Sequence, residues 1–444
     1  MNTWNKALHD LHDLRPFLTL ALTQALSALG SAMTGFALVI WSYQQEGSAL
    51  STALLSVASY APYVLMSIFA GALSDRWNKK RTMLVCDALA AATTVCVLVL
   101  LENGRLEIWH LYVINAINGL MNTVQRPASD VSVTLLTPEH LYQQACAVQS
   151  MASSIVNLIT PACATMVLTV LGLRAVLIAD LLTFAAAFLS LLLLIDLPEM
   201  EREAPDGGES LLCSAFAGLR YLKKHRGILH LIVFFAEINL IASIYNAALP
   251  AMILSVPYGG ESALAVQSTA TGLSMLLGSV LAAAAPKPKS RVRVIVCSLF
   301  LSMSTENFLL AFGRSPVLWG IGAVLGWIAI PVMNANLGAL MREYIPVGMQ
   351  GRVYSARNTL QFFTIPLGYF LGGWLIDRVF EPLMAANGAA VLSVLFGSGK
   401  GSGAAALFAV IAVCGVAVCC IFAGDRQIWA IEEKIARADR HETA

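Results

Sequence analysis

Long apolar blocks, separated by short polar segments, are the sequence feature that most limits how this chain can fold. The blocks are about 20 residues long, which is the length that an α-helix needs to cross a hydrocarbon core about 30 Å thick. The 444 residues are 57% hydrophobic and only 12% charged, against roughly 25% charged residues in a soluble domain. We therefore predict an all-α membrane protein.

Twelve apolar blocks can be delimited, and each is predicted to form one transmembrane helix. Their approximate bounds are residues 17–43, 49–74, 82–101, 109–130, 145–171, 175–195, 228–256, 265–285, 292–312, 316–341, 354–377 and 404–422. Most of the 28 Lys and Arg residues then fall in connections on one side of the membrane. The positive-inside rule assigns that side, and both ends of the chain, to the cytoplasm.

The longest predicted cytoplasmic connection is the linker 196–227, which separates six predicted helices from six others. Linkers at this place join the two halves of transporters that are built from parallel repeats. We therefore expect an N-terminal half at residues 1–195, a C-terminal half at residues 228–422 and a cytoplasmic tail at residues 423–444.

Several classes of function have little support in the sequence. The net charge is +1 and the charges are confined to short connections, so no nucleic-acid partner is expected. The nine cysteines lie mostly inside apolar blocks without a metal-ligand spacing, so neither a metal site nor a cofactor is predicted. The segment Gly397–Gly401 is not a nucleotide-binding loop, and no hydrolase motif is present, so the chain is not expected to be an enzyme.

The most specific motif lies at the cytoplasmic end of the second predicted helix. It consists of a glycine, an Asp-Arg pair and three basic residues, namely Gly71, Asp75, Arg76, Lys79, Lys80 and Arg81. An anchor that follows the positive-inside rule would explain the basic residues but neither the glycine nor the acid. The motif resembles the signature between helices 2 and 3 of the major facilitator superfamily, with Asn78 in place of a usual glycine.

This resemblance implies a major facilitator fold and a conformational latch. In the family, the acid of the loop pairs with a basic group or a helix N-terminus of the other half. The six motif residues are therefore expected to act as a latch, in which Asp75 engages Arg126 or the start of helix 11 near Arg352. Asp130, four residues after Arg126, is the other acid that could pair with Arg126. For Arg126, a contact with the substrate is the alternative interpretation.

Four further stretches, Ala28–Ser31, Gly218–Leu222, Gly351–Val353 and Phe380–Leu383, resemble the macrolide-efflux and siderophore-exporter branch. The resemblance implies proton-driven export of a drug, macrolide, siderophore or other amphipathic metabolite by a monomer in the bacterial inner membrane. The expected partners are thus a small molecule, protons and the lipid bilayer. Two alternatives stay open: a lipid (lysophospholipid) or nutrient carrier, and a membrane sensor or assembly factor that does not transport.

Polar side chains inside the apolar blocks are expected to line a central cavity. In the major facilitator fold, helices 1, 4, 7 and 10 surround that cavity, and the polar residues of predicted helices 1 and 4 share one helical face. The predicted cavity residues are Gln24, Ser27, Ser31, Thr34, Asn115, Asn118, Asn122, Asn239, Ser243, Asn246, Asn334 and Asn336. Hydrogen bonding between helices, without any ligand, is the alternative.

Acidic residues at membrane depth are candidates for proton coupling, because a charge there needs a partner or a wet cavity. Glu237 is the first choice, since it lies near the middle of predicted helix 7, although it points away from the face of Asn239. Glu306 is a second protonatable candidate. Asp87 and Asp180 lie in helices that are peripheral in this fold, and we expect them to stabilise helix packing.

Overall fold

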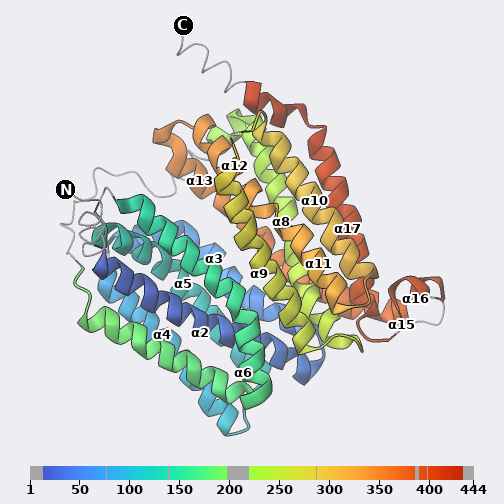
Figure 1. The fold of residues 1–444 in the computed structure, drawn as a ribbon, viewed down its shortest axis with the longest axis horizontal. Coiled ribbons are helices and arrows are strands. Elements are labelled where there is room, and N and C mark those ends of the chain that lie inside the picture. Colours follow the sequence, from blue (N-terminus) through green and yellow to red (C-terminus); the bar gives the residue numbers. More distant parts are fainter. Residues whose placement is uncertain are drawn as a thin grey trace. The chain divides into compact units, whose positions relative to one another are not determined.

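The regular secondary structure of the chain is helical wherever its placement is described (Figure 1). The computed structural model describes residues 14–76, 78–138, 141–197, 220–286, 288–385, 390–397 and 399–433. Contacts divide the chain into unit 1, Met1–Trp41 with Ala58–Gly208, and unit 2, Ser42–Val57 with Glu209–Ala444.

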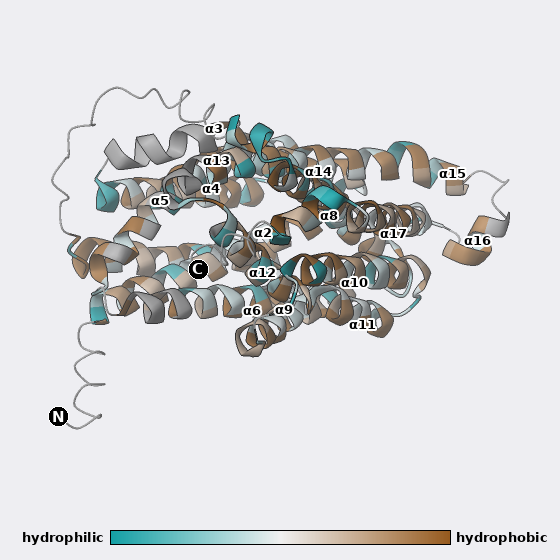
Figure 2. Ribbon diagram, turned by 90° about the horizontal axis from the view of Figure 1, so that it is seen from above, coloured by the Kyte–Doolittle hydropathy of each residue, from teal (hydrophilic) through white to brown (hydrophobic). Residues whose placement is uncertain are grey.

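Ten helices in the described ranges are long and apolar enough to cross a membrane. Apolar colouring covers much of the length of the helices, and hydrophilic residues form small patches (Figure 2). Many large apolar side chains are exposed along these helices, which is the surface that a bilayer requires.

Unit 1 contains most of α2 (Arg15–Glu46) and α3 (Ala49–Arg76), together with α4 (Lys79–Glu102), α5 (Ile108–Leu136) and α6 (Tyr142–Leu193). Helix α4 packs against both α5 and α6. Helix α5 is not among the ten apolar helices, although its 29 residues are long enough to span. The polar residues along α5 reduce its hydropathy.

Helix α6 contains a break at Gly172, whose φ of 79° and ψ of 174° are not helical. Its apolar part, Val148–Leu193, has 46 residues, which is about twice the length of one membrane span. The break falls between the spans expected at residues 145–171 and 175–195. A positive φ suits glycine, because glycine has no Cβ to clash with the backbone.

Unit 2 is a bundle in which α8 packs against α14 and α17, and α10 packs against α11, α12 and α17 (Figure 1). Its helices are α8 (Arg226–Ser255), α9 (Glu261–Ala284), α10 (Arg291–Phe312), α11 (Pro316–Trp327), α12 (Ile330–Tyr344), α13 (Val347–Phe362), α14 (Thr364–Leu375), the π-helical turn η2 (Ile376–Phe380), α15 (Glu381–Ala385), α16 (Ala390–Phe396) and α17 (Ser402–Ala423). Gly368 and Gly372 of α14 lie directly against the backbone of α8, which lets the two helices approach closely.

The segment after α17 packs onto the ends of two other helices of unit 2. Asp425 accepts a hydrogen bond from His230 Nδ1 of α8 at 2.6 Å if that nitrogen carries the proton. Glu432 accepts from the backbone N–H of Val292 and the hydroxyl of Ser290, both at 2.8 Å, and so caps the N-terminus of α10. The first part of the expected tail is therefore built into the fold.

Replacement of Gly119 by valine is expected to loosen the packing of α5 against α3. A Cβ at Gly119 would lie 2.1 Å from the carbonyl oxygen of Ser59, so the two helices must separate. Overpacking of this kind costs about 1–3 kcal/mol. The Gly119→Val protein should melt at a lower temperature in detergent. Gly35→Val is the control, because nothing lies within 4 Å of a Cβ at that position; equal melting temperatures would contradict the packing argument.

Candidate functional site

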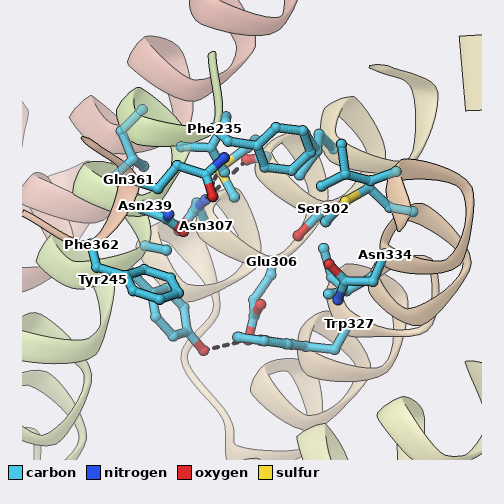
Figure 3. Close-up of a pocket in the computed structure, with 18 of the residues that line it drawn as sticks. Phe235, Asn239, Tyr245, Ser302, Glu306, Asn307, Trp327, Asn334, Gln361 and Phe362 are labelled. Carbon is cyan, nitrogen blue, oxygen red and sulfur yellow. Dashed lines mark hydrogen bonds between the residues drawn. The ribbon is translucent and has the colours of Figure 1, made fainter. Parts of the chain in front are cut away.

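A cavity of about 490 Å³ lies inside unit 2, between α8, α10, α11, α12 and α13 (Figure 3). Its polar lining residues are Asn239, Ser302, Glu306, Asn307, Asn334, Arg357 and Gln361, and its aromatic lining residues are Phe235, Tyr245, Trp327 and Phe362. The volume is within the range of small-molecule sites, which are mostly apolar with a few polar groups.

Glu306 of α10 is the buried acid of this cavity, with 3% of its surface exposed. Its Oε1 accepts hydrogen bonds from the hydroxyl of Tyr245 and, at 3.1 Å, from Nε2 of Gln267 (Figure 3 shows the first). Gln267 also donates to the Tyr245 hydroxyl at 2.8 Å, which closes a three-membered polar cluster. The cluster joins α8, α9 and α10.

The carboxyl group of Glu306 fits against a glycine face of α11. A Cβ at Gly326 would lie 2.7 Å from Oε2 of Glu306, and one at Gly322 would lie 3.5 Å from its Cα. Tyr245 and Gln267 both donate to Oε1. The other oxygen, Oε2, lies beside Gly326. The position of the acid is fixed by packing as well as by hydrogen bonds.

No basic side chain pairs with Glu306 in the part of the chain that the structure describes. A carboxylate that is buried without a cation is costly, because its charge is removed from water. Two neutral hydrogen-bond donors lower that cost but leave the charge uncompensated. The site is thus suited to take up a proton or a cationic group.

Asn307, the next residue of α10, supplies an unused hydrogen-bond acceptor. Its Nδ2 donates to the backbone oxygen of Met303 at 3.1 Å, which fixes the orientation of the amide, since the reverse orientation would place two oxygens together. Its Oδ1 is buried and has no partner within the described ranges. Such a group costs about 1–3 kcal/mol, so a bound molecule that donates to it would gain affinity.

The other predicted residues of unit 2 are distributed unevenly about the cavity. Asn239 and Asn334 line it, whereas Ser243 and Asn336 donate to backbone oxygens of their own helices, and Asn246 is exposed. Glu237 is half-buried and is not among the lining residues. The opposite orientation of Asn239 and Glu237 agrees with their spacing on a regular helix.

In unit 1, several predicted cavity residues bond the two peripheral acids. Asp180 of α6 accepts from Ser31 at 3.0 Å, from Thr34 at 3.2 Å and from Thr94 at 3.1 Å. Asp87 of α4 accepts from the side-chain amides of Gln24 at 3.3 Å and Gln125 at 2.5 Å. These contacts join helices, as expected for acids that stabilise packing.

The remaining polar residues of α2 and α5 differ in their contacts. Asn118 accepts from the hydroxyl of Thr93 at 3.2 Å, and Asn115 donates to the backbone oxygen of Leu111 at 2.8 Å. Asn122 is exposed and Ser27 is half-buried. Each of these residues stays a predicted cavity residue.

The predicted latch is described only in part. Gly71, Asp75 and Arg76 belong to the last turns of α3, but the side chains of Asp75, Arg76, Asp130 and Arg352 lie outside the described residues, and Arg126 is exposed. Lys80 donates to the backbone oxygens of Leu192 and Ile195 at the end of α6, while Arg81 and Lys79 belong to the first turn of α4.

Asn78 accepts from the backbone N–H of Arg81 at 3.1 Å and is the N-cap of α4. Asparagine in place of the usual glycine thus has a local role, because asparagine is among the strongest N-cap residues. The latch itself stays a prediction.

Sequence reasoning did not identify Tyr245, Gln267 and Trp327 as members of the site. Tyr245 and Trp327 pack with ring centroids 6.3 Å apart at the base of the cavity (Figure 3). One signal was present for Gln267, which is a lone amide in an apolar segment and therefore needs a hydrogen-bond partner there. Tyrosine and tryptophan are too common in apolar segments for their positions to indicate a site.

The family model of the Major Facilitator Superfamily matches residues 20–368. The chain belongs to the major facilitator superfamily. Among curated relatives, macrolide efflux protein A of Streptococcus pyogenes is 21% identical over 82% of this chain and 90% of its own length. The multidrug efflux pump Tap of Mycolicibacterium fortuitum is 22% identical over 82% and 89%.

Solved major facilitator structures have the same fold. A crystal structure of a mutant nucleoside transporter NupG has a TM-score of 0.70 at 15% identity, covering 92% of this chain and 99% of that chain. A bacterial homologue of the lysosomal transporter Spinster has a TM-score of 0.65 at 13% identity, with 96% of each chain covered. Membership of this superfamily, together with the efflux relatives, makes the chain a multi-pass membrane transporter and not an enzyme.

Tyr245→Phe is expected to destabilise unit 2, because it removes a donor from a buried carboxyl group and leaves it with Gln267 and Trp327 as neighbouring donors. The loss should be about 1–3 kcal/mol. Thermal unfolding in detergent measures it. Tyr258→Phe is the matched control, since Tyr258 is 38% exposed; if both variants melt alike, the hydroxyl of Tyr245 contributes nothing to the cluster.

Proposed function

We propose that this transporter exports amphipathic small molecules, such as drugs or macrolides, by proton antiport with alternating access. The observation that supports it best is the cavity of unit 2, where one buried acid without a basic partner adjoins aromatic rings and amide groups. Relatives that are named for macrolide and multidrug efflux favour the direction and the class of cargo.

The cargo is proposed to bind between the aromatic side chains of the cavity and its amide groups. Phe235, Trp327 and Phe362 supply apolar surface, which suits the large rings of an amphipathic molecule. The Oδ1 of Asn307 then accepts a hydrogen bond from a hydroxyl or an ammonium group of the cargo.

Glu306 is proposed to carry the proton. When the carboxyl group is protonated it is neutral and needs no counter-ion, and when it is deprotonated it attracts a cation, so proton and cationic cargo compete for one site. Glu237, which lies outside the cavity lining, is the second candidate. The proposal thus places the coupling acid in α10 rather than α8.

The membrane arrangement is proposed to be twelve helices in two halves of six, with both termini in the cytoplasm. The ten apolar helices become twelve when α6 is divided at Gly172 and α5 is added as a polar, cavity-lining span. The proposed cellular location is the bacterial inner membrane, where the protein is proposed to act as a monomer. The proposed cargo class includes siderophores and secondary metabolites.

Glu306→Gln is expected to abolish efflux that is driven by an imposed pH gradient, because glutamine cannot exchange a proton. Proteoliposomes with entrapped radiolabelled macrolide measure the flux, and protein-free liposomes give the background. Binding of a cationic macrolide at equilibrium should weaken, since glutamine keeps the size of the side chain but lacks the charge that attracts the cation.

Glu237→Gln is the matched control for this experiment, being the same substitution outside the cavity. It should transport at the rate of the unaltered protein. If Glu237→Gln abolishes efflux while Glu306→Gln does not, the coupling role belongs to Glu237. If the unaltered protein moves no macrolide in either direction, the proposed export of macrolides is wrong.

Asn307→Leu is expected to weaken macrolide binding about tenfold, because a donor of the cargo loses its acceptor. Quenching of tryptophan fluorescence in detergent gives the affinity, since Trp327 lines the cavity. Asn336→Leu is the control, because Asn336 bonds its own helix and does not line the cavity. Equal affinities of the two variants would remove Asn307 from the binding site.

A further inference from the structure

The first turn of α3 is capped by a carboxylate that is distant in sequence. Asp377 of η2 accepts hydrogen bonds from the Ser48 hydroxyl at 2.6 Å and from the backbone N–H groups of Ala49 and Leu50 at 3.1 and 2.9 Å. These N–H groups have no partner within the helix, and the positive end of a helix dipole favours an anion. One acid therefore holds the start of α3 in unit 2.

Gly373, one turn before Asp377, lets α14 approach the start of α3 closely at the same place. A Cβ at Gly373 would lie 2.6 Å from the Cα of Leu50 and 2.9 Å from the backbone oxygen of Ala49. Because no other residue fits there, the C-terminal end of α14 and the N-terminal end of α3 touch backbone to backbone. The π-helical turn η2 follows directly, and such turns occur often at functional positions.

The end of α2 and the start of α3 form a helical hairpin, Ser42–Val57, and further polar contacts hold this hairpin in unit 2. Tyr43 is hydrogen-bonded to Ser255, and Gln44 donates to Glu261 at 2.6 Å. Lys400 lies over the Tyr43 ring, 5.5 Å from its centroid. The chain on both sides of the hairpin, up to Trp41 and from Ala58, belongs to unit 1. The hairpin thus belongs to unit 2, whereas the rest of α2 and α3 belongs to unit 1.

The sequence around Gly373 and Asp377 repeats the sequence of the predicted latch. Gly373-Trp-Leu-Ile-Asp377-Arg378 and Gly71-Ala-Leu-Ser-Asp75-Arg76 share the pattern Gly-x-Leu-x-Asp-Arg, and both occur at the C-terminal end of a helix. The positive-inside pattern assigns Gly71–Arg76 to the cytoplasmic face and Gly373–Arg378 to the outer face. Two copies of one motif would then lie at opposite ends of the transport path.

We propose that Gly373 and Asp377 form an outer clamp, which holds the hairpin Ser42–Val57 while the transporter is closed to the outside and releases it when the outer side opens. The motif at Gly71–Arg76 is its inner counterpart, so that the two acids are engaged in turn. This inference rests on the proposed alternating access but not on the cargo or on the coupling ion.

Labelling of a cysteine at position 52 tests the clamp. Thr52 lies in the hairpin and is 5% exposed, so Thr52→Cys should react slowly with a membrane-impermeant maleimide that is added from outside. Adding Asp377→Asn should raise the labelling rate about tenfold, because the charge at the helix N-terminus is lost. Gly373→Ala should do the same by forcing the backbones apart. Mass spectrometry of the peptide that contains position 52 separates it from the native cysteines.

Glu102→Gln is the control, since Glu102 forms an ion pair with Arg174 within unit 1. It should leave the labelling rate unchanged. Ser48→Ala removes one of the three donors to Asp377, so it provides a milder variant if Asp377→Asn does not fold, and its rate should rise less. A rate that stays at the parent value in the folded clamp variants overturns the proposal.

The inner counterpart is tested by Asp75→Asn in the same assay. Loss of the inner acid favours the state that is closed to the outside, so labelling at position 52 should become slower than in the parent. An unchanged or faster rate overturns the alternation of the two acids. The assay needs neither cargo nor a gradient, so its failure is distinct from a failure of the efflux experiments.

Discussion

Polar groups in an apolar solvent must find partners within the protein, and this constraint accounts for most of the contacts described above. In hydrocarbon, an unpaired backbone or side-chain group costs several kcal/mol, by order-of-magnitude estimates. Asp87 is paired with two amides, Asp180 with three hydroxyls and Glu306 with a hydroxyl and an amide. Each acid joins at least three helices, so the groups that are hardest to bury also determine which helices are neighbours.

The same constraint distinguishes the cavity acid from the two packing acids. Asp180 accepts hydrogen bonds from three hydroxyls, which together bind both of its oxygens. Glu306 receives the hydrogen bonds of Tyr245 and Gln267 on one oxygen, while the other lies against Gly326, and Trp327 is a further neighbouring donor. Glu306 also lines the cavity, where a proton or a cationic group of a ligand can reach it. Asn307, with its unused oxygen beside it, extends the same polar patch toward a ligand.

Apolar block length and the motif at Gly71 were sufficient to predict an all-helical transporter, because both depend on the chain alone. Partners of side chains were not predictable in the same way. A helical period tells which residues share a face, but it does not tell which helix that face meets. Ser31 and Thr34 share a face as expected, yet they bond Asp180 of α6, and the role of Gln267 depends on α9 lying beside α10. Asn78 was read as a lost glycine, whereas it begins α4 as an N-cap.

The segment after α17 has a consequence for handling the protein. Ile428 and Ile431 are fully buried, and Glu432 supplies the cap of α10, so residues up to 432 belong to the packed body of unit 2. A shortened chain that stops at Gly424 would expose the apolar surface that Ile428 and Ile431 cover and leave the backbone N–H of Val292 without its acceptor. An affinity tag or fluorescent fusion therefore belongs beyond residue 433, where it leaves the cap intact.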